Sequence, residues 1–200
     1  MAADTQENIL HTAGVLFYKF GIRSVSIDDI CKELGMSKKT FYTYYKTKDE
    51  LVDNVLDSSV EHFKTMNMIL YKDDFRTGLR RFTKHQKEDK TDVRRTPQLL
   101  HDLQKYYPNQ FAQYQMKVFE VQRSQVRDIL RLGIEDGLVR SNINIEMTTL
   151  LFAKLHADTI RDIETMQEHG TDISQFMYNA MEVLLRGVLT QEGLEVLNEK

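Results

Sequence analysis

The chain has few of the residues that cross-link a fold or interrupt its helices. Its 200 residues include one cysteine, two prolines and no tryptophan. The single cysteine, Cys31, cannot form an intramolecular disulfide or a multi-cysteine zinc site, so a reducing compartment is the expected setting. Because only Pro97 and Pro108 lack a backbone donor, long helices are permitted through most of the sequence.

Long hydrophobic runs and a large excess of either charge are also missing. No apolar run approaches the ~18 residues of a membrane span, and the acidic N-terminal residues are unlike a signal peptide. We therefore expect a cytoplasmic protein without a membrane partner. A formal net charge of -3 excludes a uniformly basic coat protein, but it leaves room for a local basic patch.

The sequence also lacks the motifs of common catalytic sites. It has no glycine-rich phosphate loop, no H-E-x-x-H motif and no convincing nucleophile motif, so we expect no enzyme activity, cofactor or metal. His156 with Asp158 or Asp162 is a conceivable metal site. However, His156 and Asp158 are two residues apart and do not share a helix face.

Apolar residues recur at helical spacing along almost the whole chain, which predicts an all-α fold of about nine helices. The first apolar face ends at Phe20, and Gly21 follows as a helix C-cap. The polar stretch from Lys84 to Arg95 is expected to be exposed and mobile. We expect helices over 9–20, 27–34, 38–45, 48–66 and 75–82, one starting at 97, and others over 108–137, 144–167 and 172–190.

Residues 26–45 have the pattern of a helix-turn-helix. Ser26 and Asp29 are placed as a reciprocal N-cap pair, Gly35 opens a turn, and Ser37 can cap a second short helix. From residue 34 to 48 there are four lysines and no acid, although the chain is acidic overall. Such a basic helix can enter the major groove of DNA, yet plain helix packing would account for the pattern alone equally well.

Residues 9–56 resemble the N-terminal domain of the tetracycline-repressor (TetR) family of bacterial regulators. Cys31 and Tyr45 stand where that family commonly has alanine and phenylalanine, which are conservative departures. A weaker resemblance continues at 133–140 and 184–187. The matching residues are Ala13, Phe17, Gly21, Ser26, Ile27, Ile30, Leu34, Gly35, Ser37, Thr40, Tyr42, Tyr45, Lys48, Glu50 and Leu51.

The resemblance implies a DNA-binding domain over 1–47 and a ligand-binding and dimerisation domain over 48–200. It implies a homodimer that binds an operator and is released from it by a small-molecule effector. Most relatives of this family are repressors, so the resemblance also implies repression. Lys38 and Lys39 are the candidates for reading guanine, whereas Tyr44 and Lys48 would mainly bind phosphate. The implied DNA contacts are Ser37, Lys38, Lys39, Thr40, Tyr42, Tyr44 and Lys48. Phe41 and Tyr45 are expected to face inward.

The effector site and the dimer interface are less specified by the sequence. The last two long helices carry apolar stripes that suit an interface between two copies, and the same stripes would suit an intramolecular core. The candidates for an effector pocket are Phe63, Met66, Phe82, Leu103, Phe111, Tyr114, Met116, Phe119 and His156, with His85 and His101 as further polar contacts. For any one of these residues, core packing is the favoured role over pocket lining. The alternative function is a dimeric sensor or interaction protein that does not bind DNA.

Overall fold

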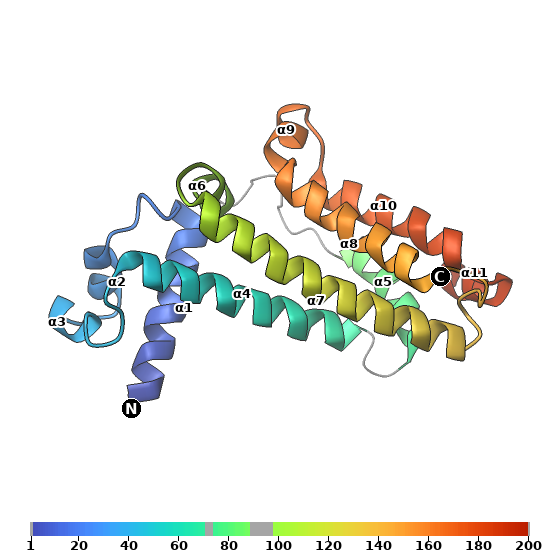
Figure 1. Cartoon of the computed structure of the whole chain (residues 1–200), viewed down its shortest axis with the longest axis horizontal. Helices are drawn as coiled ribbons and strands as arrows, with labels where there is room; N and C mark the ends of the chain where they lie inside the picture. Colours follow the sequence, from blue (N-terminus) through green and yellow to red (C-terminus); the bar gives the residue numbers. More distant parts are fainter. Residues whose placement is uncertain (1, 71–73, 89–97, 200) are drawn as a thin grey trace. The chain divides into compact units, whose positions relative to one another are not determined.

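A computed structural model describes residues 2–70, 74–88 and 98–199, which form eleven α-helices (Figure 1). Their order is α1 (Ala2–Phe20), α2 (Ile27–Glu33), α3 (Lys38–Phe41), α4 (Lys48–Leu70), α5 (Phe75–Glu88), α6 (Gln98–Tyr106), α7 (Pro108–Glu135), α8 (Ile145–Arg161), α9 (Ile163–Glu168), α10 (Ile173–Val188) and α11 (Gln191–Asn198). The predicted all-α class is confirmed. None of the helices in the described ranges is long and apolar enough to span a membrane.

The structure corrects several predicted helix boundaries. The helix expected over 144–167 ends at Arg161, and α9 follows as a separate short helix. The sequence pattern also missed α11, whose N-cap Thr190 accepts a hydrogen bond from the Gly193 backbone. The α5 helix continues through Glu88, into the polar stretch that the sequence predicts to be exposed and mobile. The predictions for residues 89–97 lie outside the described residues.

Contacts within the chain define two compact units, which we describe separately. The first unit contains residues 1–61 and 95–116, and the second contains 62–94 and 117–200. This division differs from the predicted boundary after residue 47. The helix that starts at Lys48 is continuous and contributes its beginning to the first unit, and α6 packs against α1 in the same unit.

The core of the first unit is built on the inward face of α1. Ile9, Ala13 and Phe17 are fully buried there, at the spacing that places them on one side of a helix. The helix ends at Gly21, whose φ of +84° is the left-handed conformation that glycine adopts without strain. A Cβ at Gly21 would also come within 2.7 Å of the Asp102 carboxylate on α6. The loop after α1 therefore requires glycine for both its conformation and its packing.

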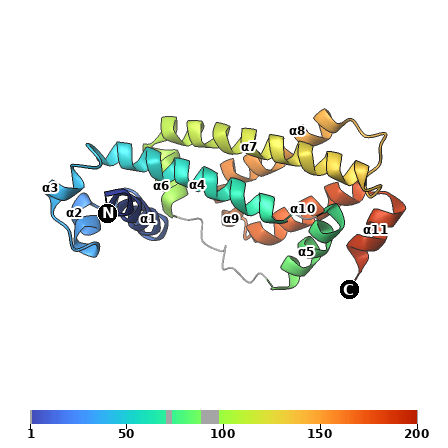
Figure 2. The same ribbon diagram turned by 90° about the horizontal axis from the view of Figure 1, so that it is seen from below.

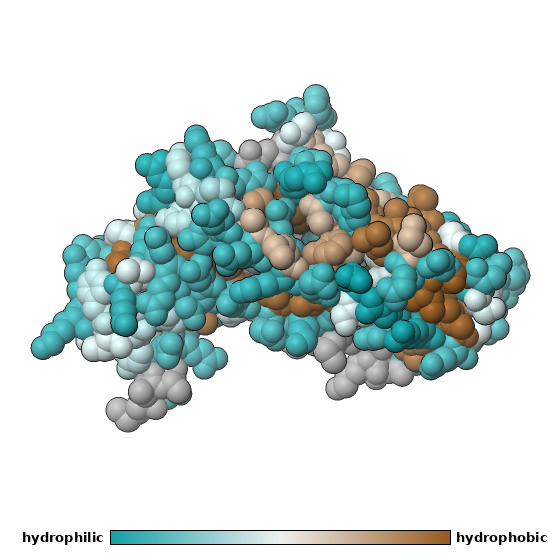
Figure 3. Space-filling model, in the orientation of Figure 1, coloured by the Kyte–Doolittle hydropathy of each residue, from teal (hydrophilic) through white to brown (hydrophobic). Residues whose placement is uncertain are grey.

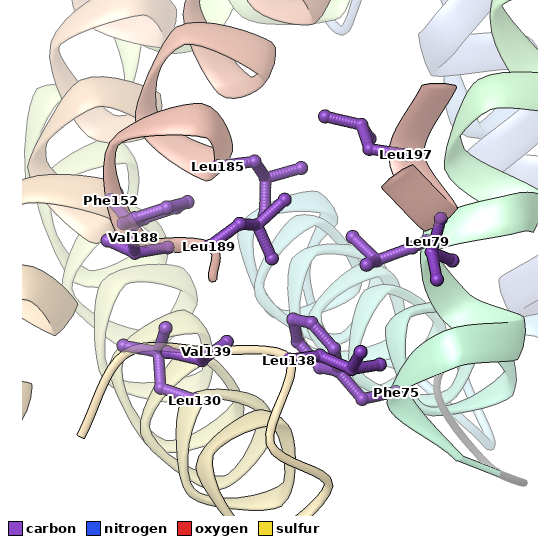
Figure 4. Close-up of a cluster of buried hydrophobic side chains, with 11 residues drawn as sticks. Phe75, Leu79, Leu130, Leu138, Val139, Phe152, Leu185, Val188, Leu189 and Leu197 are labelled. Atoms are coloured by element: carbon purple, nitrogen blue, oxygen red, sulfur yellow. The ribbon is translucent and has the colours of Figure 1, made fainter. Parts of the chain in front are cut away.

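The core of the second unit joins five helices and two loops (Figure 4). Its buried side chains are Phe75, Leu79, Leu130, Leu138, Val139, Phe152, Leu185, Val188, Leu189, Val196 and Leu197. Burying each of the larger ones stabilises the fold by about 1.5–3 kcal/mol. Helices α5 and α11 lie side by side within this unit (Figure 2).

Backbone hydrogen bonds tie two loops of the second unit together. The loop after α7 and the loop after α10 form an antiparallel bridge between Val139 and Leu189. The Arg140 N–H donates to the Val188 carbonyl, and the Thr190 N–H donates to the Leu138 carbonyl, both at 2.9 Å. These bonds fix the end of α7 against the end of α10.

Candidate nucleic-acid interface and apolar surface

The helix-turn-helix begins with a complete capping box. The Asp29 N–H donates to the Ser26 side chain at 3.2 Å, and the Ser26 N–H donates to the Asp29 carboxylate at 2.8 Å. Hydrogen bonds from Ser26 are the main reason that the pKa of Asp29 lies below its ordinary value. The predicted N-cap pair is therefore present, and it fixes the point where the chain enters α2.

The turn between α2 and α3 is closed by the backbone. α2 ends at Glu33, slightly before the predicted boundary, and Gly35 follows with a φ of +62°. The Met36 N–H donates to the Cys31 carbonyl at 2.9 Å, which is a typical glycine-terminated helix end. Cys31 is buried, and burial raises the pKa of its thiol, which disfavours the reactive thiolate form.

The second helix of the motif is short and firmly capped. The Ser37 hydroxyl accepts from the Thr40 N–H at 3.1 Å and lies 2.9 Å from the Thr40 hydroxyl. α3 ends at Phe41, before the predicted end, although a helical hydrogen bond from the Tyr45 N–H to the Phe41 carbonyl extends the helical path. The expected DNA contacts Ser37 and Thr40 are thus hydrogen-bonded to each other in the free protein.

Buried and exposed aromatic side chains alternate around α3. Phe41 and Tyr45 are buried, with exposed fractions of 0% and 2%, as the sequence predicted. Tyr42 is 49% exposed, and its ring packs edge-on against Phe41 at 5.5 Å. Tyr44 is half-buried. The inward pair anchors the helix, so that the outward Tyr42 is presented on a rigid support.

The basic side chains of this region differ in their surroundings. Lys38, Lys39 and Lys46 are exposed. The Lys38 ammonium lies 2.7 Å from the Asp28 carboxylate, in an ion pair whose side chains are both 60% exposed. Such a surface pair contributes about 0–1 kcal/mol, so a DNA phosphate could compete for the lysine.

The structure gives Lys48 a role different from the expected phosphate contact. Its ammonium is turned inward and donates to the carbonyl oxygens of Ile22 and Val25, the latter at 2.5 Å. It also lies 5.8 Å from the centre of the Phe17 ring. Burial is the main cause of the lowered pKa of Lys48. In the free protein Lys48 therefore holds the loop between α1 and α2, and its phosphate contact stays a prediction.

The candidate effector residues are divided between the two units. In the second unit the Phe63 and His156 rings are 5.6 Å apart, whereas the Phe82 ring stacks on Tyr178 at 4.5 Å. Phe119 is half-buried in that unit. Leu103, Phe111 and Tyr114 belong to the first unit, where burial raises the pKa of the Tyr114 phenol. Met116 is 69% exposed, which argues against its expected place in a pocket. The side chains of Met66 and His85 lie outside the described residues, and His101 is half-buried.

Sequence reasoning missed two polar residues in the second unit. Gln122 on α7 and Thr149 on α8 are buried, with exposed fractions of 9% and 0%. The helical periodicity places each of them on the core-facing side of its helix, so a polar residue at a core position could have identified them. Within the described ranges no three His, Cys, Asp or Glu side chains are grouped to hold a metal ion.

An exposed apolar surface lies on α8 and α10. Leu151 and Val183 are 55% and 69% exposed, and an open groove of about 370 Å³ lies between the two helices. The groove is lined by Leu151, Leu155, Phe176, Asn179, Ala180, Val183 and Leu184. Figure 3 shows hydrophobic surface over the region of these helices. The predicted apolar stripes are therefore partly solvent-facing, as an interface between copies would require.

Known proteins resemble the chain in sequence over its N-terminal residues. Residues 9–55 match the family described as "Bacterial regulatory proteins, tetR family". The HTH-type transcriptional regulator YhgD of Bacillus subtilis is 31% identical over 64 residues, which are 32% of this chain and 34% of YhgD. The regulator YvaF of the same organism is 33% identical over 51 residues, or 26% of this chain and 27% of YvaF. The chain thus matches only about a third of the length of these curated relatives.

Solved structures share the fold of almost the whole chain. The reduced form of E. coli NemR has a TM-score of 0.69 at 12% identity, over 94% of this chain and 97% of NemR. A putative transcriptional regulator from Saccharomonospora viridis in complex with choline has a TM-score of 0.66 at 18% identity, over 94% of this chain and all of that one. The sequence similarity to the tetR family thus covers residues 9–55, which include the helix-turn-helix, and the solved regulators share the fold of the chain.

Proposed function

We propose that the protein is a DNA-binding transcriptional regulator that binds an inverted-repeat operator as a homodimer. In this proposal it acts in the cytoplasm as a repressor and is released from the operator by a small-molecule effector. The observation that carries the proposal is the outward presentation of Lys38, Lys39 and Tyr42 on a capped helix whose other face is anchored by Phe41.

The proposed contacts follow from the chemistry of the exposed side chains. Lys39 can donate to guanine O6 and N7 in the major groove, and Lys38 can do so once its pair with Asp28 opens. The Tyr42 hydroxyl can donate to a phosphate, which positions the helix without selecting a sequence. Ser37, Thr40 and Tyr44 complete the proposed interface.

The apolar surface of α8 and α10 supports the proposed homodimer. Two copies that bury this surface symmetrically would present two α3 helices, and a two-fold dimer matches an operator made of two inverted half-sites. The S. viridis neighbour, described in complex with choline, illustrates that a protein of this fold can hold a small molecule. For release, the effector must bind the conformer with low DNA affinity more tightly than the other conformer.

This function is tested by selecting, from a pool of random duplex DNA, the sequences that bind the purified protein. We expect enrichment of an inverted repeat, with affinity that falls steeply as the salt concentration rises because phosphate contacts release counterions. Tyr42→Ala should weaken binding to all sequences nearly equally, whereas Lys39→Ala should also relax the base preference. Lys84→Ala, at an exposed lysine on α5, is the matched control. A folded dimer that enriches no sequence would favour the sensor without DNA binding.

A further inference from the structure

We propose that Gln122, Thr149 and His156 line a binding site in the second unit for a small uncharged molecule with an aromatic body and at least one hydroxyl or N–H group. The site would supply the effector in the proposed function, and its regulatory role rests on that function. Its existence does not depend on DNA binding and is tested separately below.

Three buried polar atoms carry the proposal. Gln122 Oε1, Thr149 Oγ1 and His156 Nδ1 are enclosed, and none has a hydrogen-bond partner in the parts of the chain that the structure describes. In folded proteins the large majority of buried polar atoms are paired. An unpaired buried polar group destabilises the folded protein, so three in one unit indicate groups kept for an external partner.

The three residues lie on the buried faces of two helices, α7 and α8. Thr149 and His156 are seven residues apart on α8 and share its inward face with Phe152 and Ala153. Gln122 lies on the buried face of α7, one turn before Gln125. Because two turns of a helix span about 10 Å, Thr149 and His156 can contact opposite ends of one small ligand.

The α4 helix connects α7 and α8 at this point. The Phe63 ring of α4 lies 5.6 Å from the His156 ring of α8. On the adjacent residue of α4, the Lys64 carbonyl accepts a hydrogen bond from the Gln125 side chain of α7 at 2.7 Å. The three helices therefore converge beside Phe63, which offers an aromatic face to the ligand.

The chemistry of the three groups defines the class of ligand. Burial lowers the pKa of His156 to about 4, so its imidazole is neutral at physiological pH. A neutral imidazole and a threonine hydroxyl each donate and accept, and the glutamine oxygen only accepts. None of the three carries a charge that would compensate the desolvation of an ionic ligand. A hydroxyl or N–H group on the ligand would satisfy the glutamine oxygen.

Simple aromatic probes test the site in the full-length protein. Phenol, indole, toluene, benzoate and choline are each titrated into the protein, and their affinities are compared. Binding is followed through the NMR ring signals of ¹³C-labelled histidine. The His156 signal is assigned from its absence in a His156→Gln sample. We expect phenol and indole to shift the His156 signal and to bind about fivefold or more tightly than toluene, which corresponds to one hydrogen bond. Benzoate and choline should bind more weakly than phenol.

Two buried threonines on α8 provide a matched pair of variants. Thr149→Val removes one of the three buried polar groups that have no partner among the described residues, so the melting temperature of the free protein should stay the same or rise. The preference for phenol over toluene should decrease, because the ligand hydroxyl loses one of its partners. The hydroxyl of the control residue Thr159 already donates to the Leu155 carbonyl at 2.8 Å. Thr159→Val should lower the melting temperature and keep the preference for phenol.

The outcomes separate the site from the regulatory function. Equal binding of phenol and toluene to the wild-type protein, or an unchanged preference in Thr149→Val, would overturn the site even if the protein binds an operator. Selective phenol binding by a protein that enriches no DNA sequence would support the site and overturn the proposed function. Stronger binding of choline than of phenol would contradict the uncharged class.

Discussion

The buried carboxylate of Asp102 on α6 accepts a hydrogen bond of 2.7 Å from the backbone N–H of Arg23, which follows α1. On its other side the same loop is held by Lys48, which binds the carbonyls of Ile22 and Val25. Two charged side chains from α4 and α6 thus satisfy a donor and two acceptors of the segment that leads into the helix-turn-helix. The position of α2 depends on this segment, because α2 starts two residues after Val25.

Removal of the Asp102 carboxylate should destabilise the first unit. Asp102→Ala leaves the Arg23 N–H without its acceptor, and we expect a loss of about 1–3 kcal/mol in the free energy of unfolding. Asp102→Asn keeps an acceptor oxygen and should lose less. Urea denaturation followed by circular dichroism measures both variants, and an Asp102→Ala protein as stable as the wild type would contradict the role of this bond.

Replacement of Lys48 separates its structural role from the phosphate role first expected. Lys48→Met should lower the free energy of unfolding by about 1–3 kcal/mol, because two carbonyl oxygens lose their donor. The slope of log affinity against log salt concentration for operator DNA should stay unchanged. If Lys48 instead bound a phosphate, the slope would become shallower by about 0.9 while stability changed little. Binding titrations at several salt concentrations distinguish the two results.

Loss of the Asp28 charge should strengthen DNA binding. Asp28→Asn breaks the 2.7 Å pair with Lys38 and removes a negative charge beside α3. We expect operator affinity to rise about three- to tenfold at low salt, with a steeper salt dependence if Lys38 gains a phosphate. As a control, Glu33→Gln also removes one negative charge, at the exposed end of α2, and should raise operator affinity less. Equal gains in the two variants would indicate only a general effect of net charge.

Charge on the apolar surface of α8 and α10 should disrupt the proposed homodimer. Val183 is 69% exposed, so Val183→Glu adds a charge that the monomer can solvate but a buried interface cannot. Sedimentation equilibrium should show a folded monomer, and operator affinity should fall with it. Val15→Glu places the same change at a 52% exposed position on α1 and should remain dimeric. If the Val183→Glu protein remains a dimer, the interface lies on another surface.

The buried imidazole of His156 should make stability depend on pH. Its pKa falls from the ordinary value of 6.5 to about 4 in the folded state because of burial. Between these values the unfolded chain binds the proton and the folded chain does not, so stability decreases as the pH is lowered from about 6.5 to 4. The expected loss is about 3 kcal/mol, and this group contributes no further loss below pH 4. Urea midpoints across this range should show a weaker dependence in His156→Gln, and an unchanged one in His11→Gln at an exposed histidine of α1.

Local hydrogen bonds explain why much of the helix-turn-helix could be predicted. The Ser26–Asp29 pair and the Ser37 cap each join residues three apart, so their chemistry is visible in the sequence. The same local rules failed at α11, where the N-cap Thr190 also bonds to the Gly137 carbonyl in a distant loop. A short helix of this kind is stabilised by its tertiary contacts more than by its own turns.

The sequence alone determined the all-α class, most helix starts, the inward Phe41 and Tyr45 pair and the resemblance to one regulatory family. Only the tertiary structure decided that Lys48 binds backbone carbonyls and that Lys38 pairs with Asp28. It also showed that three buried polar atoms of α7 and α8 have no partner among the described residues. The physical reason is the range of the interactions. Periodicity and capping act within one or two turns, whereas the partner of a long charged side chain or a buried polar atom is set by residues far away in the chain.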